Sequence, residues 1–157
     1  VAVRAEKLLA AMSAQGDVAQ LSSDQTAGLW REIRDVSPYA DGSQRPLWRV
    51  SMPPSEGWKL VAGLRLRAGV DAFYDWQGGL IWMRMEADPE AEILRHGIRT
   101  LGGGHATLMR APDAVRAVTP AFEPQSPAVA LLSQRIRAKF DPHGIFNPGL
   151  MAPGASL

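Results

Sequence analysis

Few residues in this chain have the types and spacing that catalysis or metal binding requires. His96, His105 and His143 lie far apart and lack the spacing of metal ligands, such as two histidines at i and i+4 on one helix face. Cysteine is absent, which excludes disulfides, thiolate metal sites, iron–sulfur clusters and cysteine nucleophiles. We therefore predict no metal site and assign no catalytic residue.

Two further groups could carry chemistry but have simpler interpretations. Gly102-Gly103-Gly104 follows a predicted helix, whereas a phosphate-binding loop precedes one, so we interpret these glycines as a helix terminator. Asp71 and Asp75 fall on the same face of a predicted strand and could form a carboxylate pair. Their position beside a hydrophobic hairpin favours a solvated edge instead.

The segment Asn147-Pro148-Gly149 is a predicted turn that follows Ile145 and Phe146 and holds an amide side chain in a fixed geometry. Such an amide can hydrogen-bond the polar ring atoms of a ligand, or it can cap its own turn. Local chemistry alone favours the second interpretation.

The elements that must position these residues follow from hydrophobic periodicity and from the turn residues. We predict helices at 2–13, 22–35, 54–67, 89–101 and 129–140, and strands at 18–21, 47–52, 72–76, 80–86 and 105–109. Ser22 and Gln25 have the form of a capping box, Asp88 is the predicted N-cap of the fourth helix, and 111–127 is predicted to be irregular. The order favours an α+β fold: a ferredoxin-like antiparallel or mixed sheet with helices packed on one face.

Length and charge narrow the class of protein. A chain of 157 residues suffices for one domain, 1–157, with a flexible tail at 150–157. The net charge of +1 gives no basic field for nucleic acid, so no nucleic-acid partner is predicted. The chain has no initiator Met and begins at or inside a helix, so we expect it to be a fragment of a longer protein.

The run Phe140-Asp141-Pro142-His143-Gly144-Ile145-Phe146-Asn147-Pro148-Gly149 resembles the C-terminal signature of FAD-linked oxidases of the vanillyl-alcohol-oxidase type. Residues 29–40, 47–54, 73–82 and 103–112 are similar to the E-type FAD-binding subunit of bacterial glycolate oxidases in particular. The resemblance implies the C-terminal, substrate-side domain of an FAD-dependent oxidoreductase that acts on a small 2-hydroxy acid. It also implies that FAD is bound mainly by an N-terminal domain that this chain does not contain.

The resemblance extends to sites and partners. Asn147, Pro148 and Gly149 correspond to a segment that approaches the flavin ring in the family. Arg34 is the candidate for binding the substrate carboxylate, because in the wider family an arginine near a comparable Leu-Trp element has that role. A solvated helix face with Arg34 paired to an acid such as Asp35 is the alternative. Sister flavoprotein and iron–sulfur subunits are the expected partners, in a cytoplasmic complex that could lie at the inner membrane.

The resemblance also shows a departure from the family pattern. Metal-dependent relatives carry His-x-Gly-Asp-Gly-Asn-x-His at a strand turn, and the two histidine positions here hold Asp75 and Trp82. No Glu-His pair follows Gly103-Gly104, so the usual metal and acid–base centre is expected to be absent. The alternative from another class is a stand-alone ferredoxin-like interaction or ligand-sensing module. Five Trp residues in one small domain also predict an exposed apolar patch and self-association of the fragment.

Overall fold

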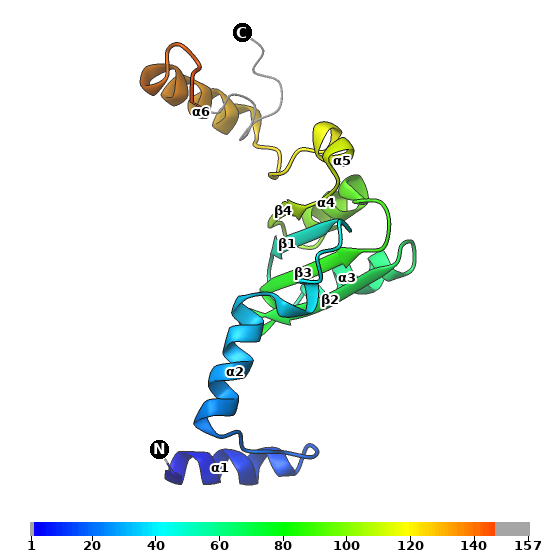
Figure 1. The fold of residues 1–157 in the computed structure, drawn as a ribbon, viewed down its shortest axis with the longest axis vertical. Helices are drawn as coiled ribbons and strands as arrows, with labels where there is room; N and C mark the ends of the chain where they lie inside the picture. The colour runs from blue at the N-terminus through cyan, green and yellow to red at the C-terminus, as the bar shows by residue number, and fades with distance from the viewer. Residues whose placement is uncertain (1, 147–157) are drawn as a thin grey trace. The chain divides into compact units, whose positions relative to one another are not determined.

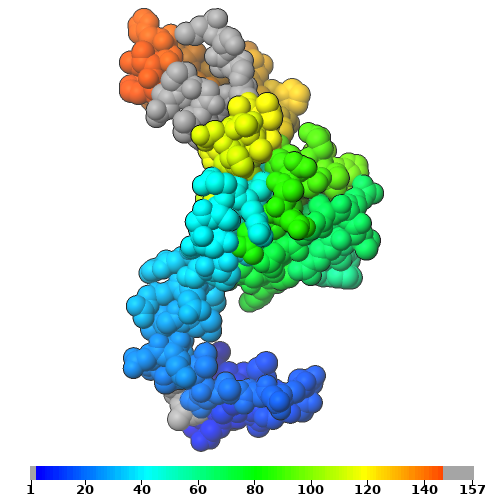
Figure 2. Space-filling model, turned by 45° about the vertical axis from the view of Figure 1, so that its right-hand side comes forward, coloured from blue at the N-terminus to red at the C-terminus, as the bar shows by residue number. Residues whose placement is uncertain are grey.

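The computed structural model describes residues 2–146, which divide into two compact units, Val1–Asp41 and Gly42–Leu157. The larger unit contains the whole β-sheet, and in Figure 2 the green and teal atoms of this unit are closely packed. Each unit is described by itself below.

The N-terminal unit is helical. It consists of α1 (Ala2–Ser13), α2 (Ser23–Arg34) and the short 3-10 helix η1 (Ser37–Tyr39). The predicted capping box is confirmed: Gln25 N–H donates to Ser22 Oγ at 3.2 Å, and Ser22 N–H donates to Gln25 Oε1 at 2.9 Å. The strand predicted at 18–21 is wrong, because this extended segment pairs with no strand among residues 2–146.

The larger unit has the ferredoxin-like βαββαβ order that the sequence predicted (Figure 1). Its elements are β1 (Leu47–Ser51), α3 (Gly57–Arg65), β2 (Val70–Asp75), the 3-10 turn η2 (Trp76–Gly78), β3 (Leu80–Met85), α4 (Ala91–Thr100) and β4 (His105–Arg110). The four strands are arranged in the order β2-β3-β1-β4, and every adjacent pair is antiparallel. The two central strands are therefore β1 and β3.

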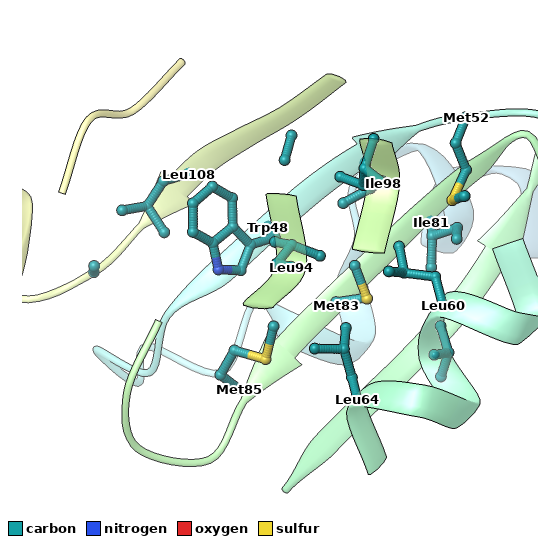
Figure 3. Close-up of a cluster of buried hydrophobic side chains, with 14 residues drawn as sticks. Trp48, Met52, Leu60, Leu64, Ile81, Met83, Met85, Leu94, Ile98 and Leu108 are labelled. Carbon is teal, nitrogen blue, oxygen red and sulfur yellow. The ribbon is translucent and has the colours of Figure 1, made fainter. Parts of the chain in front are cut away.

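The hydrophobic core lies between one face of this sheet and helices α3 and α4 (Figure 3). Alternate residues of the two central strands point into it, beginning with the fully buried Trp48 and Val50. The indole N–H of Trp48 donates to the carbonyl oxygen of Pro89 at 2.8 Å, so the polar atom of this large side chain is satisfied. The other main contributors are Leu60, Val61, Leu64, Ile81, Met83, Met85, Leu94, Ile98 and Leu108.

The core face of α3 is formed by Leu60, Val61 and Leu64, and Trp58 of the same helix is 60% exposed. Two details of the helices differ from the prediction. The N-cap of α4 is Glu90 in a left-handed conformation, and not Asp88. The segment predicted to be irregular contains a helix of its own, α5 (Asp113–Val118), which lies against the sheet unit through Val115 (Figure 2).

The connection after α5 lies along the outer edge of β4. Leu108 N–H donates to the carbonyl oxygen of Ala121 at 2.8 Å. Arg95, a buried residue of α4, donates through Nη2 to the carbonyl oxygens of Pro120 at 2.6 Å and Phe122 at 2.9 Å. The connection leads to α6 (Pro127–Phe140), where the predicted helix is confirmed but its apolar side chains are exposed.

Candidate functional site on the second face of the sheet

Of the predicted site residues, Arg34 is the one that lies within the described part of the chain. Arg34 lies at the end of α2 in the N-terminal unit, where its Nε and Nη2 donate to the two carboxylate oxygens of Asp35 at 2.7 and 3.0 Å. This hydrogen bonding lowers the pKa of Asp35 from its ordinary value. The guanidinium edge that would bind a substrate carboxylate is thus occupied by Asp35, which matches the alternative interpretation. The substrate-binding role of Arg34 stays a prediction.

The predicted flavin-contacting residues Asn147, Pro148 and Gly149 lie outside the described residues. The turn before them is well defined. The Asp141 carboxylate accepts hydrogen bonds from the backbone N–H groups of Ile145 and Phe146, each at 2.9 Å. The N–H of Phe146, followed by that of Ile145, holds the pKa of Asp141 below its ordinary value.

Local hydrogen bonds and packing also account for Asp75 and Trp82, the two positions at which the resemblance led us to look for metal-binding histidines. The Asp75 carboxylate caps the turn η2 by accepting a hydrogen bond from Trp76 N–H at 2.7 Å. Trp82 is half-buried on β3, opposite Phe73 of β2. Across residues 2–146 no three His, Asp or Glu side chains are grouped for metal binding. The expectation that the intact protein holds no metal stays a prediction.

The best candidate for a binding site is the sheet face that points away from α3 and α4. Strand alternation turns Trp48 and Val50 into the core, so Arg49 and Ser51 of the same central strand face the other way. The antiparallel register places Arg49 between Trp82 of β3 and Thr107 of β4. It places Ser51 beside His105, two pairs further along the same strands.

The turn η2 supplies the aromatic wall of this site. The Arg49 guanidinium carbon lies 5.4 Å from the centre of the Trp76 ring, a cation–π arrangement. Trp76 has a φ of 49° and Gln77 a φ of 57°, which is the left-handed region that bulky residues rarely occupy. Such strain persists only where the surroundings enforce it, and it is concentrated at functional sites.

Several contacts enforce the conformation of this turn. Gly79 donates its N–H to the carbonyl oxygen of Trp76 at 3.0 Å and accepts a hydrogen bond from Met52 N–H at 3.1 Å. A Cβ at Gly78 would lie 3.0 Å from the carbonyl oxygen of Pro54, just before α3. The end of β1 and the start of α3 therefore fix the position from which Trp76 reaches Arg49.

Arg49 is the residue that the sequence interpretation missed. The strand alternation that buries Trp48 and Val50 on one side also places Arg49 on the opposite side of a central strand. An arginine at such a position is surrounded by strands on both sides, unlike an arginine on an exposed helix. That contrast with Arg34 was available from the sequence.

A hollow elsewhere in the unit has a structural explanation. It has a volume of about 450 Å³ and lies between the start of α4 and the connection after α5, with Ile93, Arg95, Thr119 and Pro120 among its lining residues. Arg95 already donates to the connection and lies 5.3 Å from the Trp48 ring. The Arg95 guanidinium therefore stabilises the fold and is not available to bind a ligand in this hollow.

The chain is 30% identical over 132 residues to "Glycolate oxidase subunit GlcE" of Escherichia coli (strain K12), a match that covers 83% of this chain and 33% of that protein. The chain thus spans about a third of the length of this relative. No protein-family model matches the chain, and no solved structure matches it. A stretch covering 83% of the chain must include all four strands, so the relationship to glycolate oxidase subunit GlcE extends over the sheet that carries Arg49.

Proposed function

We propose that this chain is the C-terminal, substrate-side domain of the FAD-binding subunit of a glycolate-oxidase-type complex. The observation that carries the proposal is the 30% identity to the glycolate oxidase subunit over most of the chain. In this proposal the intact subunit takes part in the FAD-dependent oxidation of a small 2-hydroxy acid, and FAD supplies the redox chemistry while the protein positions the reactants.

The described residues fit a substrate-side role better than a role in holding the whole cofactor. A dinucleotide-binding loop is rich in glycine and precedes a helix, so that its N–H groups meet the pyrophosphate. The Gly102-Gly103-Gly104 run follows α4 and leads into β4 instead. We therefore assign the pyrophosphate site to a separate FAD-binding domain and derive no step through the flavin from residues 2–146.

Exposed apolar side chains support the proposal that the chain is covered by partners. On α6 they form a stripe with Ile136 51% and Phe140 82% exposed, and on α2 Trp30 is 61% exposed. Amphipathic helices of this kind ordinarily bury their apolar stripe. The proposed partners are the FAD-binding domain of the same subunit and the sister flavoprotein and iron–sulfur subunits. Among residues 2–146, no helix is long and apolar enough to cross a membrane.

The test uses the intact subunit purified in its complex. Anaerobic addition of glycolate or D-lactate should bleach the visible absorbance of bound oxidised flavin, and a complex made without this subunit should fail to form or lose that response. Residues 1–157 produced alone should carry no stoichiometric flavin. An intact subunit without flavin, or an isolated fragment with a full complement of it, would overturn the proposal and favour the stand-alone module.

A further inference from the structure

Arg49 differs from Arg84 and Arg110, the other arginines on the described strands, because no anion or carbonyl oxygen among residues 2–146 accepts a hydrogen bond from it. Arg84, on the same face, donates to the Asp71 carboxylate at 3.0 Å. Arg110 donates to the carbonyl oxygen of Arg45 and to Ser43 Oγ. For Arg49, the described part of the chain supplies only the face of Trp76 and no hydrogen-bond acceptor.

A half-buried guanidinium with its donors unused is a site for an oxyanion. Arginine carries five N–H donors in a planar fork that matches the two oxygens of a carboxylate. The Trp76 ring covers part of the guanidinium but takes none of its in-plane hydrogen bonds, so it restricts the side chain without competing for the ligand.

The charges around Arg49 also favour an added anion. The two acids of β2 already have hydrogen-bond partners, Asp71 in Arg84 and Asp75 in the backbone N–H of Trp76. No Asp or Glu among the described residues lies within ion-pair distance of Arg49. The positive charge at the centre of the face is thus uncompensated within residues 2–146.

The polar neighbours suit a small hydroxylated acid. The register pairs Thr107 of β4 with Arg49, and it pairs Ser51, two residues along β1, with His105. Directly paired and diagonal side chains on one face of an antiparallel sheet are about 5 to 8 Å apart. Ser51, Thr107 and His105 can therefore reach a hydroxyl group on a small molecule whose carboxylate is bound at Arg49.

We infer that Arg49, braced by the strained Trp76 turn, is the residue that binds the carboxylate of a small 2-hydroxy acid on the second face of the sheet. The identification of the ligand as the substrate rests on the proposed function, whereas the carboxylate site itself does not. Arg49 acts here as a substrate-binding residue, in place of the exposed and ion-paired Arg34.

The binding test uses the intact subunit in its complex and oxalate, a planar carboxylate with no C–H bond to oxidise. Isothermal titration of Arg49→Gln should show an oxalate Kd raised by about 10- to 100-fold, since a charge-assisted bidentate contact is lost. The oxalate Kd of Arg49→Lys should lie between those of the unmodified protein and Arg49→Gln, because lysine keeps the positive charge but lacks the planar fork of donors. Titration with inorganic phosphate distinguishes a general oxyanion site from a carboxylate site: equal or tighter phosphate binding would overturn the inference.

The kinetic test separates binding from structure. Arg49→Gln should raise the KM for glycolate by a similar factor, and the activity of Arg49→Ala should be partly restored by free guanidinium, which a purely structural role would not allow. Arg67→Gln is the matched control, because Arg67 is exposed beyond the end of α3. Unchanged oxalate binding and KM in a folded Arg49→Gln complex would refute the inference while leaving the proposed function intact. A complex without oxidase activity whose oxalate binding still depends on Arg49 would refute the proposed function alone.

Discussion

Replacing Arg95 by alanine should destabilise the sheet unit far more than the same replacement of Arg99, an exposed arginine on the same helix. The Arg95 side chain is 4% exposed, donates two hydrogen bonds to the connection after α5, and stacks on Trp48. A hydrogen bond from a charged donor contributes about 1.5–3 kcal/mol, and a desolvated cation–π contact about 2 kcal/mol. The two hydrogen bonds share one nitrogen atom, so their contributions do not simply add.

We expect Arg95→Ala to lower the free energy of unfolding by about 4 kcal/mol, within the range measured when one partner of a buried charge pair is removed. Its Nε lies 3.5 Å from Glu123 Oε2 without a hydrogen bond, which limits the contribution of that pair. The matched control is Arg99→Ala, because Arg99 is 57% exposed and 3.9 Å from the same glutamate. The control should cost less than about 1 kcal/mol.

Urea unfolding followed by tryptophan fluorescence measures both free energies. Hydrogen exchange adds a local measurement, because the Leu108 amide is protected by Ala121 in the connection that Arg95 holds. Arg95→Ala should accelerate exchange at Leu108 even under native conditions. Equal losses of stability for Arg95→Ala and Arg99→Ala, with unchanged exchange at Leu108, would refute the reasoning.

Three further predictions follow from the turns of the larger unit. Gln77→Gly should raise the free energy of unfolding by about 0.5–1 kcal/mol in a urea titration, since glycine adopts the left-handed conformation of this position without strain. A loss of stability would show that the turn is not strained. Because the pKa of Asp141 is lowered in the folded protein, its contribution to stability is present above the ordinary pKa of the group and is lost as pH falls through the lowered value, below about pH 4. The protection factors of the Ile145 and Phe146 amides, which are exchange rates corrected for their intrinsic pH dependence, should fall in that acidic window, and Asp141→Asn should abolish this change. Elemental analysis of the intact subunit should find no stoichiometric zinc or manganese, and a metal that is lost in Asp75→Ala would mean that a metal centre persists with altered ligands.

The α+β class and the order of the sheet elements could be predicted from the sequence because the pattern is strong there. Trp48 and Val50 alternate with polar residues, and the glycines at 78 and 79 mark the hairpin turn. The segment 18–21 has the composition of a strand, but a strand needs a partner, and pairing between distant segments cannot be read from local composition.

Local rules failed where the packing overrides them. Asp88 is a good N-cap by residue type, yet α4 begins after Glu90 in a left-handed conformation. Trp58 has the hydrophobicity of a core residue, but the buried stripe of α3 is complete without it.

The candidate site was harder to predict than the fold. Arg34 was chosen from its neighbours in sequence, whereas Arg49 becomes a candidate only when three strands and the η2 turn are placed around it. That no residue in the described part of the chain accepts a hydrogen bond from Arg49 is likewise visible only once the sheet is assembled. The sequence indicates the face of the strand on which Arg49 lies, but it does not indicate which side chains surround Arg49 there.

The hydrogen bond between Leu108 and Ala121 has a consequence for how this protein behaves in concentrated solution. The border of a β-sheet attracts any extended chain that can continue the ladder, which is a common route to aggregation. At β4 that border is already occupied by the connection, with Glu123 near the Ala106 N–H, and at β2 it carries the carboxylates of Asp71 and Asp75. Growth of the sheet by a second copy is thereby opposed at both borders, so any self-association of the fragment should proceed through its exposed helices instead.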